Sequence, residues 1–241
     1  GDRRVHASLI RWLALGAPGD DAVQLHEHGL QIAGALVGSD GQADPIMAGT
    51  TPGLDLGGCK LDHDLGLLGC RFRDTPVLRG AKVQTLNLEA SHLPGLEADR
   101  LEAWGDVFLR GVQATGEVRL LGARIGGDLS CLGGRFETEG GRALSADRLE
   151  ARDNVSLDEV RAKGEVGLSG ARLGGNLVCA GGRFENPGGK ALNADGVRVT
   201  GAFFWRGGSH ANGALDLTAA EIGTICDDPA CWPGPGDLLL N

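Results

Sequence analysis

Two short clusters combine histidine with carboxylates, the side chains that most often bind metal ions. They are His26-Glu27-His28 and Asp62-His63-Asp64. Residues i and i+2 of a strand share a face, so His26 and His28 have the spacing of a chelating pair. Both clusters border polar turns, and neither has a third or fourth ligand at a fixed spacing. We therefore expect solvated loop residues here and no bound metal.

The cysteines offer thiol and zinc chemistry, but their spacing does not fit a zinc site. A structural zinc site uses two pairs of closely spaced ligands. Cys226 and Cys231, near Asp227 and Asp228, form one pair, and the second pair is missing. We therefore predict no zinc. The six cysteines are Cys59, Cys70, Cys131, Cys179, Cys226 and Cys231.

Carboxylates and arginines recur at matched positions of a repeat that is described below. Two carboxylates catalyse glycoside hydrolysis when they converge at one site about 5–10 Å across. A solvated residue that is copied with its repeat explains these matches without catalysis. Tyrosine is absent, so the aromatic platforms that bind sugars are scarce. We assign no catalytic, cofactor-binding or metal-binding residue, and we expect the sequon Asn154-Val155-Ser156, in a predicted strand, to stay unmodified. The matched pairs are Asp147/Asp195, Arg124/Arg172 and Arg135/Arg183.

A long internal repeat determines the architecture. The segment Gly116–Cys131 returns as Gly164–Cys179, and Ala143–Asp147 returns as Ala191–Asp195. Inside the repeat, a shorter module of about 11 residues recurs, and each copy carries two apolar residues separated by one polar or small residue. These pairs are Val107/Leu109, Val118/Leu120, Leu129/Cys131, Leu144/Ala146, Val155/Leu157, Val166/Leu168, Leu177/Cys179, Leu192/Ala194 and Phe203/Trp205.

Each apolar pair indicates a very short strand with one buried face. Such strands become stable when successive coils stack and equivalent residues form ladders through a shared interior. Each long repeat contains a few residues more than a whole number of modules. These extra residues fall in Glu137–Gly141 and Glu185–Gly189, which are polar and rich in glycine and are predicted to be loops. The 42 glycines suit a chain that turns constantly.

We predict an all-β fold, a right-handed parallel β-helix with about 22 residues per coil from two modules of about 11 residues, and a short N-terminal capping helix. Cys131 and Cys179 then lie two coils apart, roughly 10 Å, which is too far for a disulfide. They are expected to act as small core residues, which favours a reducing cytoplasm. The expected ladders are Val118/Leu144/Val166/Leu192/Leu215, Val107/Leu129/Val155/Leu177/Phe203 and Cys131/Leu157/Cys179/Trp205.

Three segments follow from this pattern. Residues 1–20 form the capping helix, with Val5, Leu9, Trp12 and Leu13 at helical spacing. Residues 21–227 form the β-helix, with about nine coils. Residues 228–241 are a rigid, extended exit rich in proline and glycine, and we expect it to be truncated.

The repeat phrases Gly116–Leu129 and Ala143–Asp147 resemble those of a bacterial repeat family that is common in actinobacteria. Its members are often labelled oxidoreductase or membrane-associated oxidoreductase. The resemblance covers most of Gly29–Asp228, and it implies a fold rather than an activity. The module is also distantly similar to pentapeptide-repeat proteins, which are right-handed quadrilateral β-helices, although its length is not a multiple of five. The sequence has no Gly-x-Gly-x-x-Gly that opens a helix after a strand, so we predict no dinucleotide cofactor and no enzyme activity.

Composition narrows the function further. The net charge of −9 argues against direct nucleic-acid binding, and no apolar run is long enough to cross a membrane. Our leading hypothesis is a non-enzymatic scaffold or protein-interaction module in the cytoplasm, with an unknown protein partner, and with membrane association only through a missing C-terminal region. Homo-oligomers through a β-helix end are a further option. The alternatives are a DNA-mimicking inhibitor of an enzyme such as a topoisomerase, and a polysaccharide-active β-helix enzyme.

Overall fold

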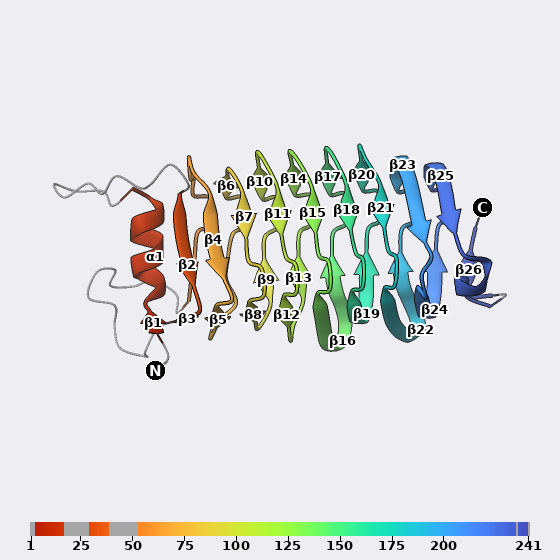
Figure 1. The fold of residues 1–241 in the computed structure, drawn as a ribbon, viewed down its shortest axis with the longest axis horizontal. Helices are drawn as coiled ribbons and strands as arrows, with labels where there is room; N and C mark the ends of the chain where they lie inside the picture. The colour runs from red at the N-terminus through yellow and green to blue at the C-terminus, as the bar shows by residue number, and fades with distance from the viewer. Residues whose placement is uncertain (1–2, 17–28, 39–52, 235, 241) are drawn as a thin grey trace.

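The computed structural model describes residues 3–16, 29–38, 53–234 and 236–240, and it is nearly all β. About eight parallel coils stack along one axis. The helix α1 (Ala7–Ala14) lies at one end of the stack and the C-terminus at the other (Figure 1). This architecture confirms the predicted parallel β-helix with a short N-terminal helix.

Four short strands make up each coil, and equivalent strands of successive coils pair in parallel. We name the resulting stacks the first to fourth strand rows, in chain order. The first and fourth rows belong to a sheet of 14 strands, and the second and third rows to a sheet of 12. In one coil the four strands are β11 (Val107–Phe108), β12 (Gln113–Ala114), β13 (Val118–Arg119) and β14 (Arg124–Ile125).

The remaining strands extend these rows. The first row also contains β2 (Leu30–Ala33), β4 (Leu65–Leu68), β7 (Leu86–Asn87), β15 (Leu129–Ser130), β18 (Val155–Ser156) and β21 (Leu177–Val178). The second contains β1 (Arg3–Val5), β3 (Ala35–Val37), β5 (Arg71–Phe72) and β8 (His92–Leu93), and the third contains β9 (Leu96–Glu97) and β26 (Leu238–Leu239). The fourth contains β6 (Lys82–Val83), β10 (Glu102–Ala103), β17 (Glu150–Ala151) and β20 (Arg172–Leu173). Longer strands span two rows: β16 (Arg135–Ser145), β19 (Arg161–Gly167), β22 (Arg183–Asn193), β23 (Arg198–Trp205), β24 (His210–Asp216) and β25 (Glu221–Asp227).

The interior is built from the predicted ladders. Val118 pairs with Leu144, and Val107 pairs with Leu129, each one coil further along. These side chains are fully buried. The sequence did not predict the second and fourth rows, because their inward residues include small ones such as Ala114 and Ala151, which give no strong apolar alternation.

A left-handed backbone turn recurs once in each module and gives the module its length. Gly111 and Gly122 both have φ +61°, a conformation that glycine adopts without strain. Arg100 and Arg148 occupy equivalent positions in neighbouring coils with φ 56°. The left-handed turn therefore forms at this position of the coil whichever residue occupies it, and glycine adopts it with the least strain.

The predicted loops Glu137–Gly141 and Glu185–Gly189 are instead parts of strands β16 and β22. The pairing of β16 with β19 shifts register between Glu137 and Arg142, as in a β-bulge. The prediction was wrong because the extra residues are absorbed as an outward bulge, with pairing resumed on both sides.

The N-terminal segment differs from the prediction in detail. Arg3–Val5 forms β1 and pairs with β3, because an extended segment satisfies the backbone groups of that edge strand. The helix α1 starts after it and buries Ala7, Ile10 and Ala14, whereas Leu9 is exposed.

Side chains of α1 and of the first coils hold the helix against the stack. The ring nitrogens of His63 lie 3.0 Å from the carbonyl oxygens of Asp64 and Ala14. Arg11 donates to the carbonyl oxygen of Asp55. These contacts fix the helix across the end of the β-helix.

The C-terminal segment is more regular than the predicted extended exit. Pro229–Cys231 forms a 3₁₀ turn, and β26 pairs with β24 through Leu238 and Leu215. Trp232 packs on Trp205, with ring centroids 6.2 Å apart. The segment thus covers aromatic core residues of the last coils.

A chain of Asp and Asn side chains ties consecutive coils together between the fourth and first rows. The Oδ1 atom of each residue accepts a backbone N–H one coil further on, at 2.8–2.9 Å. The Nδ2 atoms of the two asparagines also donate to the preceding residue, at 3.0 and 2.9 Å. This polar ladder satisfies backbone groups that the short strands leave unpaired. It runs through Asp106, Asp128, Asn154, Asn176 and Ala202.

We expect Asn154→Ala to lower the free energy of unfolding by about 1–3 kcal/mol, because it removes the acceptor for Asn176 and the side-chain donor to Asp128. Urea unfolding measures the loss. The matched control is Asp153→Ala at the exposed neighbour, which should change stability little. Equal stabilities of the two variants would contradict the structural role of the ladder.

Candidate functional site

A groove of about 700 Å³ follows the fourth strand row. It crosses β10, β14, β17, β20 and the start of β23. Its length over these five coils is about 19 Å at 4.8 Å per coil. Its floor includes Ile125 and Leu173, and arginines line much of its wall. It can therefore receive an extended ligand that has both apolar and anionic groups.

An exposed tryptophan stands in this groove. Trp104 follows β10 directly and is 64% exposed. The other three tryptophans, Trp12, Trp205 and Trp232, are buried or half-buried. A large aromatic residue that is left in solvent beside a groove is a typical contact residue for a partner.

The outward side chains of the fourth row alternate in charge up to Arg172, where Arg198 follows with the same sign. The Glu150 carboxylate lies 3.5 Å from Arg124 and 3.5 Å from Arg172, on the coils before and after it. Arg198 pairs with Glu221 at 3.1 Å. All five of these side chains are largely exposed, and exposed ion pairs contribute only about 0–1 kcal/mol. The guanidinium groups can therefore exchange these partners for anions of a ligand at little cost.

At one end of the groove, Glu102 keeps its charge. The Lys82 ammonium lies 2.7 Å from its carboxylate and lowers the pKa of Glu102. Arg152, by contrast, is exposed and has no carboxylate within 4.0 Å among the described residues. The lining thus has four arginines against two glutamates, Glu102 and Glu150.

At two positions of the groove the backbones of successive coils pack so closely that only glycine fits, and the absent side chains leave the groove open there. A Cβ atom on Gly126 would lie 2.0 Å from the Trp104 carbonyl oxygen, and one on Gly174 would lie 2.0 Å from the Arg152 carbonyl oxygen. A side chain at either position would force the coils apart. The gaps beside Trp104 and Arg152 are therefore fixed by the backbone.

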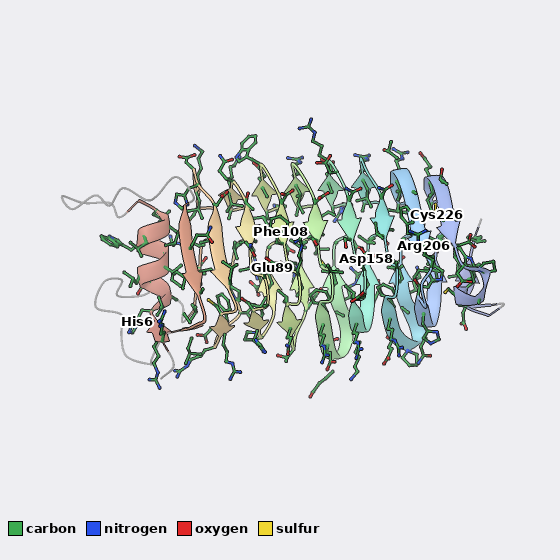
Figure 2. All side chains as sticks on the ribbon, viewed as in Figure 1. His6, Glu89, Phe108, Asp158, Arg206 and Cys226 are labelled. Atoms are coloured by element: carbon green, nitrogen blue, oxygen red, sulfur yellow. The ribbon has the colours of Figure 1, made fainter. Side chains whose placement is uncertain are left out.

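A second hollow of about 480 Å³ lies along the first row, and its polar groups already bind one another. Asp128 and Asn154 belong to the polar ladder. Arg110 lies 4.7 Å from the Phe108 ring and donates to Ser130 at 3.0 Å. Figure 2 labels Phe108 on this row. The fourth-row groove is the better candidate because its exposed tryptophan and Arg152 have no such intramolecular partners among the described residues.

The structure places the predicted metal candidates apart from this groove. Asp62 pairs with Lys60 at 2.6 Å, and both His63 ring nitrogens face carbonyl oxygens. Within the described residues, no group of three or more potential ligands is arranged to hold a metal ion. His26-Glu27-His28 lies outside the described residues.

The acids near the C-terminal cysteines have structural partners. Asp227 accepts from the Trp232 indole N–H at 2.5 Å, and Asp228 accepts from the Ala230 N–H at 3.1 Å. Cys226 and Cys231 are both free thiols. These contacts position the 3₁₀ turn.

The matched repeat residues have separate environments. Asp147 pairs with Arg142 and accepts from the Ser169 N–H, whereas Asp195 is exposed. The second-row arginines Arg135 and Arg183 face solvent on either side of Arg161. Of the matched pairs, only Arg124 and Arg172 meet in the groove.

The sequence alone did not indicate Trp104, Arg152 and Arg198 as site residues. Trp104 lies in a degenerate coil, outside the long internal repeat, so its match to Arg152 appears only once the register is known. The signal available in the sequence was a tryptophan that lies outside every predicted apolar pair, where an outward side chain is expected.

Comparisons with protein-family models, curated proteins and solved structures return no match. The resemblance of the repeat phrases to an actinobacterial family therefore stays a prediction. In the described part of the chain, no helix has the length and apolar character needed to cross a membrane.

We expect the cysteines to divide into two reactivity classes. Burial raises the pKa of Cys131 to about 12 and raises those of Cys179 and Cys70, so these thiols stay protonated and enclosed. Cys59, Cys226 and Cys231 are half-buried and should react with a thiol reagent at about pH 8.

Mass spectrometry of the labelled native protein identifies the modified positions. Protein unfolded in urea is the control and should label at all six positions. Rapid labelling of Cys131 or Cys179 in the native protein would contradict their place in the core.

Proposed function

We propose that this chain is a non-enzymatic binding module for a protein partner, and that an extended acidic segment of the partner lies in the fourth-row groove. The observation that carries the proposal is Trp104, exposed beside a groove with arginine walls and an apolar floor. Tryptophan and arginine are enriched among the residues that dominate binding energy at protein interfaces.

Charge complementarity supports an acidic segment. Arg124 and Arg172 share one carboxylate, that of Glu150, and Arg152 has no ion-pair partner among the described residues. A ligand carboxylate near these groups would gain charge-assisted hydrogen bonds. An extended peptide advances about 3.3 Å per residue, so about six residues span the groove.

The groove gives less support to a polysaccharide-active enzyme. The carboxylates of Glu102 and Glu150 are both held in ion pairs with basic side chains. A glycosidase needs one carboxyl group that stays protonated as a general acid, and the pKa of Glu102 is lowered, not raised. Trp104 is the only tryptophan in the groove, so a row of aromatic sugar platforms is also missing from the described lining.

A DNA mimic is likewise less favoured. Six of the 32 acidic residues and none of the 23 basic residues lie outside the described ranges, so the described part has a net charge of −3. Its fourth row carries both signs of charge, and its second row carries Arg135, Arg161 and Arg183 in register. DNA mimicry requires continuous negative charge along one face.

We place the module in a reducing compartment such as the cytoplasm, since all six cysteines are free. Self-association through the last coil is the second candidate. Ile225 on β25 is 48% exposed there, as an edge contact would require.

Selection from a displayed library of random peptides tests the proposal. Peptides of about 12 residues exceed the length of the groove. We expect the retained peptides to be enriched in Asp and Glu, and Trp104→Ala to weaken their binding about tenfold or more, as for an interface hot spot. Fluorescence anisotropy of labelled peptides measures the affinities.

The matched control is Leu132→Ala, which removes an exposed apolar side chain outside the groove and should leave binding unchanged. Circular dichroism establishes that both variants are folded. Retained peptides that bind equally well to Trp104→Ala, or a selection that retains none, would overturn the proposal.

A further inference from the structure

Trp104, Gly126 and Arg152 occupy the same position of three successive coils. Their N–H groups donate to Val83, Ala103 and Ile125, which are themselves equivalent residues of the fourth row. The middle position has no side chain. At about 4.8 Å per coil, the backbones of Trp104 and Arg152 are about 10 Å apart. The backbone between Trp104 and Arg152 therefore has one position without a side chain, and we call this position the gap.

The spacing of about 10 Å leaves room for one aromatic ring in this gap. Carbon atoms in contact lie about 3.5–4.0 Å apart, so a ring with a flat group on each side needs about 7–8 Å. Tryptophan is the aromatic side chain that attracts cations best, and the planar guanidinium of arginine stacks on aromatic faces. Both groups are exposed, so neither has to leave a buried contact to receive the ring.

We propose that the gap between Trp104 and Arg152 binds an aromatic side chain of an acidic peptide. This rests on the proposed function and specifies the recognition element of the same groove. The ring enters above Gly126, and neighbouring carboxylates of the peptide contact Arg124 and Arg172, which line the groove two coils apart. The recognised sequence is thus an aromatic residue flanked by Asp or Glu.

The lining favours a peptide over a nucleic acid. Glu102 and Glu150 stand in the same groove and would repel a phosphate backbone. The floor near the gap is formed at Ala103 and Ile125, whose side chains belong to the core. A peptide can match this mixture of charges, whereas a nucleic acid presents a phosphate at every nucleotide.

The test uses small probes, so that it does not depend on any selected peptide. N-acetyl-tyrosinate and N-acetyl-leucinate carry the same carboxylate and differ in the ring. The probes are titrated into the full chain while the indole N–H resonance of Trp104 is followed by NMR. We expect a saturable shift with the tyrosine probe, and binding of the leucine probe weaker by about fivefold or more.

Arg152→Met keeps the length of the side chain and removes the flat cation. We expect this substitution to weaken binding of the tyrosine probe by about fivefold, toward the affinity for the leucine probe. The matched control is Arg135→Met, an exposed arginine of the second row, which should leave the titration unchanged. Equal affinities for the two probes, or no effect of Arg152→Met, would overturn the proposal.

Two further outcomes separate this inference from the function it rests on. Stronger binding of uridine monophosphate than of the tyrosine probe would overturn the peptide as occupant. Acidic peptides that bind at Trp104 without any preference for an aromatic residue would contradict the aromatic-ring site alone. The proposed function would remain supported.

Discussion

In-register parallel pairing between successive coils is the constraint on which the whole structure depends. Each strand of two residues makes too few contacts to be stable alone, so stability comes from the stack. Pairing fixes equivalent residues about 4.8 Å apart along every row. Any side chain that faces outward thereby becomes part of a line. Where charges alternate along such a line, the side chains form ion pairs with one another. Where a side chain has no partner, it is available to a ligand.

The polar ladder and the groove both follow from this in-register pairing. In the ladder, Asp106, Asp128, Asn154 and Asn176 use the repeat distance to bond to each other and to the backbone. In the groove, glycines replace side chains on alternate coils, so the same repeat distance leaves gaps beside Trp104 and Arg152. The fold thus supplies both its own cross-links and a surface groove with a regular repeat.

The sequence predicted the stack because its apolar pairs recur once in every module with large side chains such as Val107 and Leu129. It did not predict the second and fourth rows, whose inward residues include small ones such as Ala114 and Ala151. The bulge at Glu137–Gly141 resembled a loop because its composition is polar, and only pairing with the next coil makes it a strand. The groove was hidden for a related reason: Trp104 and Arg152 become neighbours through the register between coils.

The register between coils builds the groove on the fourth row that we propose as a binding site. Amide shift mapping by NMR, with and without an acidic peptide that the chain retains, tests it most directly. We expect shifts at Trp104, Gly126 and Gly174, which lie along one groove, and none at Leu132. Shifts confined to the first or second row, or to the last coil at β25, would contradict it.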